Sequence, residues 1–319
     1  MRRGKRVSII GAGNVGSTVA YSLALQATVH EIILLDSKPD IAWGKALDMS
    51  QAAAVMRGHT KVRLARHEKD LADSDIVVIT AGSPRKPGMS RDDLLMVNAE
   101  TVRSIARQIK EHCANPIVIV VTNPLDAMTY VALRETGFDR RQVIGMAGLL
   151  DSGRMASFIY EKLGYGSGQI RATVLGGHGD SMVPLHRYST VAGVPVSDLL
   201  SGEEIEEIVK RTRNGGAEIV SYLGDGSAYY APAIATAMMC EAILRDSKQI
   251  YPCAVLLNGE YGYRNIVTGV PIVLGANGVE KIIEVTLNKS EENEFEQSVE
   301  AVKKLLDKLR EMGFYDEQN

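Results

Sequence analysis

Cysteine is scarce in this sequence, and long apolar runs are missing from it. The three cysteines, Cys113, Cys240 and Cys253, are odd in number, lie far apart and form no C-x-x-C pair. That arrangement argues against a disulfide framework and against a zinc site, and it suits a reducing cytosol. No apolar run approaches the roughly 20 residues that a membrane-spanning helix needs. We therefore predict a cytoplasmic protein without a metal site or a membrane segment.

A strong charge of either sign is also absent. The chain has 36 Lys and Arg against 39 Asp and Glu, a formal net charge of −3 in 319 residues. Such a balance gives no general attraction to nucleic acid or to anionic membranes, so bound anions must be held by local arginines. The basic start, residues 1–6, precedes an apolar run of only four residues, which is too short for the core of a signal peptide. The length is sufficient for two fused lobes.

Residues 5–36 carry the pattern of a dinucleotide-binding unit. A short apolar run leads into Gly11-Ala12-Gly13-Asn14-Val15-Gly16, and a second apolar run ends at Asp36. The three glycines suit a tight turn, close approach of the backbone to a pyrophosphate, and close packing of a helix on a strand. A helix beginning near Asn14 would direct its positive dipole end at the phosphates. The carboxylate of Asp36 would accept hydrogen bonds from the adenosine ribose and repel a 2′-phosphate, which favours NAD as cofactor.

Further strand-length apolar runs recur through residue 147. They cover residues 75–81, 117–121 and 143–146, and helical periodicity lies between them at about 42–58 and 95–109. Alternating strands and helices predict an α/β domain, a Rossmann-type doubly wound parallel sheet, over residues 1–147. Ligands of such a sheet lie beyond the carboxyl ends of its strands.

Residues 148–319 have a different pattern, which predicts an α+β domain on the substrate and catalytic side. A helix should end at Gly164, Ser201 should begin another with a capping box, and Ser290 should cap the last. Further predicted elements are a strand over 170–177, a buried helix over 229–244 and antiparallel strands over 254–257 and 270–274. We interpret the apolar segment 238–240 as core rather than as a subunit interface.

Three polar residues of the second half are catalytic candidates. His178 stands between glycines in G-G-H-G-D, and its pKa near neutrality would let it give or take a proton, although a structural histidine is an equal alternative. Asp151 and Arg154 share one face of a predicted helix, where a surface ion pair is the simplest interpretation. In the functional interpretation, Asp151 orients the imidazole of His178 and Arg154 binds a carboxylate with its planar guanidinium.

The first half adds two arginines and an asparagine to this set. Arg85 and Arg91 lie on or beside the loop 82–90, which has two prolines and two glycines. Each alone could be a solvated charge, but together they would bring two positive charges to a ligand if the loop closed over it. Asn123 follows a predicted strand, at the carboxyl edge where the cofactor should bind.

Five motifs, in this order and spacing, resemble the lactate/malate dehydrogenase family over nearly the whole chain. They are G-A-G-N-V-G-S, T-A-G-S-P-R-K-P-G-M-S-R-D-D-L, V-T-N-P-L-D, L-L-D-S-G-R and G-G-H-G-D. At the position of Arg85, lactate-specific members of the family carry glutamine and malate-specific members carry arginine. The malate-specific motif is intact from Arg85 to Arg91, so the chain is most similar to the malate-specific, lactate-dehydrogenase-like branch.

The resemblance implies a role for each matching residue. His178 would be the proton acceptor and donor, with Asp151 as its partner. Arg154 would bind the C1 carboxylate, Arg91 would polarise the reacting carbonyl, and Arg85 would bind the distal carboxylate. Orientation of the substrate is implied for Asn123, and cofactor contacts for Gly11, Ala12, Gly13, Asn14, Val15, Gly16, Asp36, Asn98, Val121 and Thr122.

The activity that the resemblance implies is reversible oxidation of (S)-malate to oxaloacetate with NAD, a step of the tricarboxylic acid cycle. A lactate-type 2-hydroxy acid dehydrogenase is one alternative, disfavoured because pyruvate would leave Arg85 without a counter-ion. A non-catalytic NAD sensor is another, but it would have no use for His178 and Asp151. Lys38, beside Asp36, leaves room for some NADP. The resemblance also implies a homo-oligomer, and a tetramer rather than a dimer.

Overall fold

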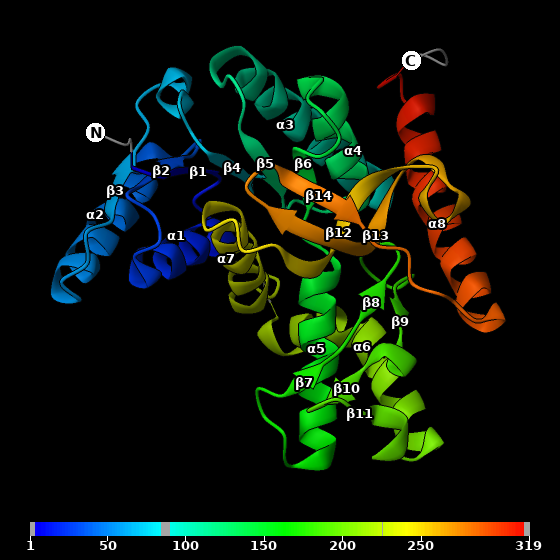
Figure 1. Ribbon diagram of the computed structural model, residues 1–319. Coiled ribbons are helices and arrows are strands. Elements are labelled where there is room, and N and C mark those ends of the chain that lie inside the picture. The colour runs from blue at the N-terminus through cyan, green and yellow to red at the C-terminus, as the bar shows by residue number, and fades with distance from the viewer. Residues whose placement is uncertain (1–3, 84–89, 225, 316–319) are drawn as a thin grey trace.

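The computed structural model describes residues 4–83, 90–224 and 226–315, without the side chain of Arg91. Within these ranges, one nine-stranded sheet lies at the centre of the molecule (Figure 1). Its parallel strands are β1 (Arg6–Ile10), β2 (Glu31–Leu35), β3 (Lys61–Leu64), β4 (Ile76–Ile79), β5 (Ile117–Val120) and β6 (Val143–Gly145). Its antiparallel strands are β12 (Gln249–Asn258), β13 (Arg264–Gly275) and β14 (Gly278–Ile282).

The strand order contains the reversal that defines a doubly wound sheet. The order is β14-β13-β12-β6-β5-β4-β1-β2-β3, so the chain builds outward from β1 in one direction and then returns to β4 to build in the other. Strand β1 pairs in parallel with both β2 and β4. In sheets of this kind the ligand binds where the order reverses, beyond the carboxyl ends of the strands. The predicted Rossmann-type sheet is confirmed.

Helices cover both faces of this sheet (Figure 1). On one face, α1 (Asn14–Gln26) contacts α2 (Pro39–Val55) and α7 (Tyr230–Leu244). On the other, α3 (Arg91–His112) contacts α4 (Leu125–Thr136) and α8 (Lys289–Glu311). Strands covered on both sides must be apolar at every position, which explains the fully buried Ile-Val-Val-Ile of β4.

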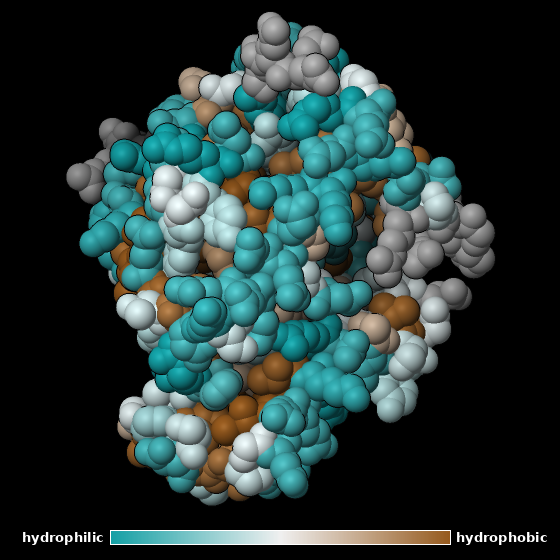
Figure 2. Space-filling model, turned by 90° about the vertical axis from the view of Figure 1, so that its right-hand side faces the viewer, coloured by the Kyte–Doolittle hydropathy of each residue, from teal (hydrophilic) through white to brown (hydrophobic). Residues whose placement is uncertain are grey.

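A smaller layer lies below the central sheet in Figure 1. It is built from α5 (Gly148–Leu163), α6 (Gly202–Leu223) and the short strands β7 (Ile170–Arg171), β8 (Val174–Leu175), β9 (Val183–Pro184), β10 (Thr190–Val191) and β11 (Val194–Pro195). Met155 and Ile159 of α5 pack there against Ile205 and Ile208 of α6. Figure 2 shows a mainly hydrophilic face with hydrophobic side chains gathered in this lower part.

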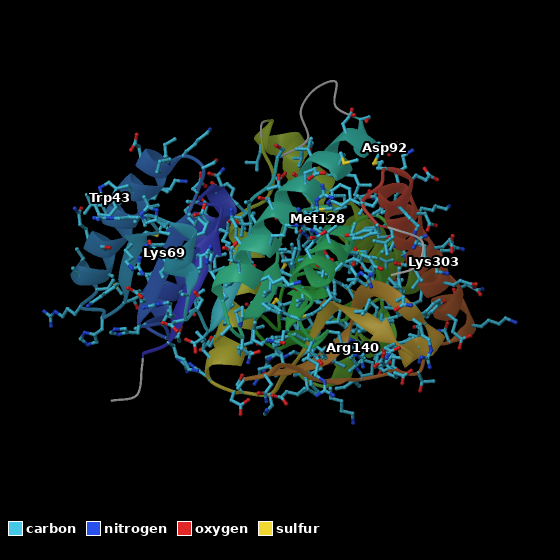
Figure 3. All side chains as sticks on the ribbon, turned by 90° about the horizontal axis from the view of Figure 1, so that it is seen from above. Trp43, Lys69, Asp92, Met128, Arg140 and Lys303 are labelled. Carbon is cyan, nitrogen blue, oxygen red and sulfur yellow. The ribbon has the colours of Figure 1, made fainter. Side chains whose placement is uncertain are left out.

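The antiparallel strands of the second half do not form a separate sheet. Strand β12 pairs with β6 at Ala254 and Gly145, and this pairing joins them to the parallel strands. A Cβ atom at residue 145 would lie 2.5 Å from the hydroxyl of Thr129 and 2.9 Å from the Cβ of Ala254, so only glycine permits this contact. Arg140 adds a two-pronged ion pair with Glu260, with the closer N–O distance 2.8 Å (Arg140 is labelled in Figure 3).

Several predicted element ends are confirmed and others are wrong. Gly164 ends α5 in the left-handed conformation, and Ser201 forms the capping box of α6. The last helix is capped by Asn288 and not by Ser290, because the Asn288 side chain accepts hydrogen bonds from the next turn. The strand predicted over 170–177 is divided into β7 and β8, and β3 was not predicted at all.

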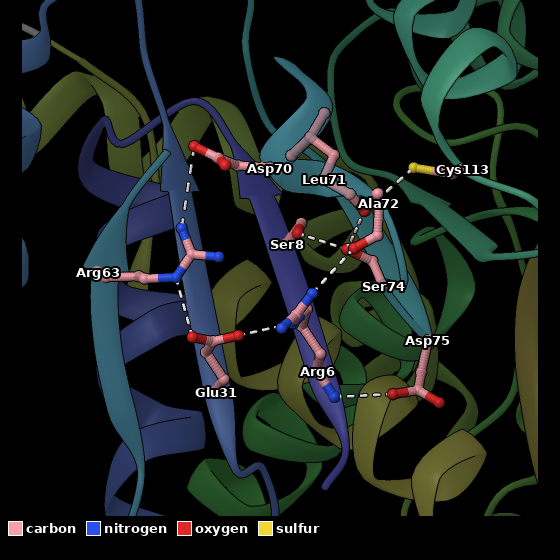
Figure 4. Close-up of polar contacts among 10 residues, drawn as sticks. All are labelled: Arg6, Ser8, Glu31, Arg63, Asp70, Leu71, Ala72, Ser74, Asp75 and Cys113. Atoms are coloured by element: carbon pink, nitrogen blue, oxygen red, sulfur yellow. Dashed lines mark hydrogen bonds and ion pairs between the residues drawn. The ribbon is translucent and has the colours of Figure 1, made fainter. Parts of the chain in front are cut away.

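A chain of charged residues crosses the amino ends of the parallel strands (Figure 4). Arg6 and Arg63 both bind the carboxylate of Glu31, at 2.6 and 2.9 Å, and Arg63 also lies 4.0 Å from Asp70. Burial raises the pKa of Glu31, but the hydrogen bonds and charges of the two arginines outweigh it and hold that pKa below its usual value. In the same region, the hydroxyl groups of Ser8 and Ser74 are hydrogen-bonded to each other.

The three cysteines are free thiols buried in the core. Burial raises the pKa of Cys113 to about 11 and that of Cys240 to about 12, and it raises the pKa of Cys253 further. Met239 and Cys240 are fully buried, as predicted, while Met238 lies at the surface. Among the described residues, no helix is long and apolar enough to cross a membrane.

Candidate active site

The glycine turn between β1 and α1 has the geometry of a pyrophosphate site. Gly11 has a φ of +102°, and a Cβ there would lie 2.6 Å from the backbone nitrogen of Ala81, so a side chain is excluded. At Gly16 a Cβ would collide with the carbonyl oxygen of Gly11. At Gly13 a Cβ would meet nothing within 4 Å, and this residue is also the N-cap of α1. A ligand can therefore approach the uncapped amides at the start of α1.

Asp36 lies directly after β2, beside the glycine turn. Its Oδ2 accepts the N–H of Ala12 at 2.6 Å and its Oδ1 accepts the N–H of Lys38 at 2.8 Å. Each oxygen keeps a second lone pair for a ribose hydroxyl. The ammonium of Lys45, which sequence reasoning missed, donates to the carbonyl oxygen of Ala12 at 2.7 Å. The residues present therefore fit an adenosine ribose and a pyrophosphate.

The carboxyl ends of β4 and β5 are joined by Asn98 of α3. Its Nδ2 donates to the carbonyl oxygen of Asn123 at 2.7 Å, and its Oδ1 accepts the N–H of Ser83 at 2.7 Å. Thr122 donates to the carbonyl oxygen of Ala81 at 2.7 Å. Asn98, Thr122 and Val121 are buried, whereas Asn123 is exposed. The predicted cofactor contacts of the first three stay predictions, and so does orientation of the substrate by Asn123.

The structure brings His178 and Asp151 together, although 27 residues separate them in sequence. The Nδ1 of His178 lies 2.8 Å from Oδ2 of Asp151, and Oδ1 of Asp151 accepts a hydrogen bond from Arg154 at 3.1 Å. The side chains of His178, Asp151 and Arg154 are 13%, 1% and 12% exposed, so solvent is largely excluded from this group. A bound Nδ1 leaves Nε2 of the imidazole as the nitrogen that can exchange a proton with a substrate.

The carboxylate of Asp151 makes His178 a better base. Burial disfavours the charged imidazolium, but the charge and the hydrogen bond of Asp151, with the more distant charge of Asp126, outweigh burial and hold the pKa of His178 above its usual value. The positive charge of Arg154 opposes them. This balance favours an imidazolium that can protonate a substrate oxygen near neutral pH.

Arg154 has the surroundings of an anion-binding residue. A Cβ at Gly215 of α6 would lie 3.3 Å from its Cδ, closer than an ordinary contact, so the lack of a side chain there makes room for Arg154. The Nε of Arg154 is buried and, within the described part of the chain, has no hydrogen-bond partner. A buried donor of this kind is costly unless a ligand satisfies it. Arg154 can therefore hold a carboxylate beside His178.

Asp126, in the first turn of α4, was not singled out from the sequence. Its side chain is 3% exposed, and its Oδ2 accepts the backbone N–H of His178 at 2.8 Å. The only sequence signal was its place at the end of V-T-N-P-L-D. Two predicted substrate residues cannot be placed, because Arg85 and the side chain of Arg91 lie outside the described residues.

A dinucleotide-binding sheet, a buried histidine–carboxylate pair and a neighbouring arginine are the parts that a dehydrogenase of hydroxy acids needs, since they can hold the cofactor, exchange a proton and bind a carboxylate. Two family models match this chain: the NAD binding domain of lactate/malate dehydrogenase over residues 5–145, and the alpha/beta C-terminal domain of the same family over residues 149–312. The chain belongs to the lactate/malate dehydrogenase family. The predicted division between residues 147 and 148 stays a prediction.

Relatives and solved structures match over almost the full length. A malate dehydrogenase of Sulfurimonas denitrificans is 65% identical, with 99% of each chain covered. The malate dehydrogenase of Cryptosporidium parvum superposes with a TM-score of 0.94 at 40% identity, covering 97% of this chain and 100% of that one. A lactate dehydrogenase of the same organism, with lactic acid and cofactor, gives 0.93 at 36%, covering 97% and 99%. The fold alone therefore does not separate the two substrates.

Proposed function

We infer that this chain is an NAD-dependent malate dehydrogenase, which reversibly oxidises (S)-malate to oxaloacetate. The single observation that supports catalysis most directly is the buried contact of His178 with Asp151, next to Arg154. The choice of malate is supported by relatives that bear this name at 65% and 59% identity. It is also supported by the arginine at position 85 of the sequence motif, which would give the second carboxylate a positive partner.

NAD, when bound, accepts or returns the hydride. The chain's own residues would hold the cofactor through the glycine turn and Asp36, and they would handle the proton. In the direction of oxaloacetate reduction, the imidazolium of His178 donates its Nε2 proton to the keto oxygen. In the direction of malate oxidation, the neutral imidazole takes the hydroxyl proton. Asp151 keeps Nδ1 protonated in both directions and thereby fixes the tautomer.

Three arginines would each bind a different group of the substrate. Arg154 binds the C1 carboxylate beside His178, and Arg85 binds the distal carboxylate. Arg91 stabilises the negative charge that develops on the reacting oxygen. Pyruvate, with one carboxylate, would leave Arg85 without a partner, and we therefore place lactate dehydrogenase activity second.

One assay tests the proposed function directly. The purified protein is mixed with NADH and oxaloacetate, and the loss of nicotinamide absorbance is followed, with pyruvate and NADPH in parallel reactions. We expect rapid oxidation of NADH with oxaloacetate and much slower reactions with pyruvate or with NADPH. An equal rate with pyruvate would support the lactate-type alternative. A protein that binds NADH but oxidises it with neither substrate would be the non-catalytic sensor.

We also propose a homo-oligomer, a tetramer rather than a dimer. Several exposed apolar side chains lie on α2, where Figure 3 labels Trp43 at the outer side of the molecule. Apolar side chains also line an open groove of about 1110 Å³ between α5, α6, α7 and β12. Exposed apolar patches on a folded chain usually mark binding surfaces, protein interfaces among them. The exposed apolar residues of α2 and its end are Ile41, Trp43, Leu47, Val55 and Met56, and those of the groove include Tyr222, Tyr230, Ile234, Met238 and Ile250.

Light scattering tests the assembly, and we expect a mass of four chains. If α2 of one copy packs in the groove of another, Trp43→Glu should reduce that mass. Tyr165→Glu is the matched control, because Tyr165 is equally exposed, at 54%, and does not line the groove. We further propose a cytoplasmic location and a role in the tricarboxylic acid cycle, which the free thiols and the malate–oxaloacetate reaction support.

A further inference from the structure

The loop that carries His178 is held by three consecutive backbone N–H groups. That of Gly176 donates to the carbonyl oxygen of Gly269 in β13 at 2.8 Å, and that of Gly177 donates to the hydroxyl of Ser298 in α8 at 2.7 Å. The third, that of His178 itself, donates to Oδ2 of Asp126 in α4 at 2.8 Å. Each acceptor belongs to a different element, and only the third can carry a charge.

The Asp126 carboxyl is unusual for a loop support. It is 3% exposed, and its second oxygen, Oδ1, is buried without a hydrogen-bond partner among the described residues. A neutral acceptor would hold the His178 N–H equally well, as Ser298 does for Gly177. A buried carboxylate with one unsatisfied oxygen costs free energy that a purely structural role would not require. The ability of this group to ionise is therefore the feature that a purely structural role leaves unexplained.

Two ionisable groups act on Asp126 from the elements around it. The imidazole of His178 favours the carboxylate, and the carboxylate of Asp151 disfavours it. Because burial is the largest effect, the pKa of Asp126 rises to about 7, and because the charges of Asp126 and His178 act on each other, the two groups titrate as a coupled pair. Gly177 packs closely against α8, since a Cβ there would lie 2.9 Å from a methyl group of Val302.

We propose that Asp126 is a positioning residue for proton transfer: it holds the backbone of His178 and adds a second negative charge, besides that of Asp151, that favours the imidazolium. Oδ2 keeps the hydrogen bond while the unpartnered Oδ1 is the oxygen that takes a proton. The proposal rests on the proposed function and extends it. If the wild-type enzyme does not oxidise NADH with oxaloacetate, the proposed function fails, whereas failure of the present proposal is seen only in the variants of an active enzyme.

The test compares Asp126→Asn with Ser298→Ala over a pH range. Asp126→Asn keeps an oxygen acceptor for the His178 N–H but removes the charge, whereas Ser298→Ala removes a neutral acceptor from the adjacent N–H. For oxaloacetate reduction we expect the pH at which kcat/KM falls to half to drop by about half a unit or more in Asp126→Asn. Its rate should recover toward that of the wild type at lower pH. In Ser298→Ala the midpoint should not move.

Two results would overturn the proposal. One is an Asp126→Asn enzyme with an unshifted midpoint and the same fractional loss at every pH, which is the behaviour of a purely structural residue. The other comes from the wild-type enzyme, and it is needed if Asp126→Asn does not bind NADH because it has not folded. The wild-type enzyme is then titrated by infrared spectroscopy, which should show a buried carboxylic acid ionising near neutral pH. The lack of such a band would exclude a titrating Asp126.

Discussion

The charged groups at the two ends of the parallel strands are satisfied in opposite ways. At the amino ends, Arg6 and Arg63 both bind the carboxylate of Glu31 (Figure 4). At the carboxyl ends, Arg154 keeps a buried Nε and Asp126 a buried Oδ1 without partners among the described residues. Groups that satisfy each other stabilise a fold, whereas groups left unsatisfied are costly and usually serve a ligand or a reaction. Substitutions at the two ends should therefore affect different properties.

The largest effect is expected at His178. His178→Asn should lower kcat by about 10²–10⁴-fold, because the variant cannot exchange a proton with the substrate, while NADH affinity stays close to that of the wild type. Stopped-flow turnover and fluorescence titration with NADH measure the two quantities. His59→Asn, at an exposed position, is the control and should retain full turnover. Near-normal turnover of His178→Asn would remove this residue from the mechanism.

The next largest effect is expected in substrate choice. Arg85→Gln should lower the ratio of kcat/KM for oxaloacetate to that for pyruvate by about 100-fold, because the distal carboxylate loses its partner and pyruvate no longer leaves an arginine unpaired. Steady-state kinetics with both substrates measure the ratio. Lys86→Gln removes a positive charge from the same loop and should leave it nearly unchanged. A ratio that did not respond to Arg85→Gln would contradict the role of this residue.

A third prediction concerns pH. Asp151 holds the pKa of His178 above its usual value, so the imidazolium persists into a higher pH range than for a free histidine. Oxaloacetate reduction, which needs the charged form, should be constant at low pH and fall about tenfold per unit above that pKa. Malate oxidation, which needs the neutral form, should rise over the same range. If the rates of both reactions rose with pH, or both fell, over this range, the assignment would be contradicted.

The smallest effect is expected at the amino ends. Glu31→Gln should cost about 1–2 kcal/mol of unfolding free energy at pH 7 and leave turnover unchanged, since it breaks a charge network far from the chemistry. The pKa of Glu31 is lowered in the folded state, so its stabilisation is present above the unfolded pKa and is lost as pH falls through the folded one. Denaturant melts at several pH values measure this. Glu300→Gln, at an exposed ion pair, should cost almost nothing.

Local patterns predicted the parts of the fold and site that depend on neighbours in sequence. The glycine turn, Asp36 and the caps at Gly164 and Ser201 each follow from a few adjacent residues. Strand β3 was missed because K-V-R-L is short and half charged. The pairing of β12 with β6 joins residues more than 100 positions apart, and no local pattern reports it.

The catalytic pair and its support show the same limit. The family motifs marked His178 and Asp151, and the structure adds the 2.8 Å contact between them. Asp126 carries no such mark, because an aspartate after asparagine, proline and leucine resembles an ordinary first-turn acid. Its contact with His178 spans 52 residues of sequence and depends on how α4 meets the loop after β8.

The buried thiols also have a practical consequence. Cys113 lies at the end of α3, Cys240 in α7 and Cys253 in β12, so they sample both faces of the central sheet and the sheet itself. With their raised pKa values and almost complete burial, they react mainly when the surrounding structure opens. The rate at which a thiol reagent modifies each cysteine therefore reports how often the structure around that cysteine opens. Because one sheet unites the halves of the chain, the three cysteines should be modified at the same rate.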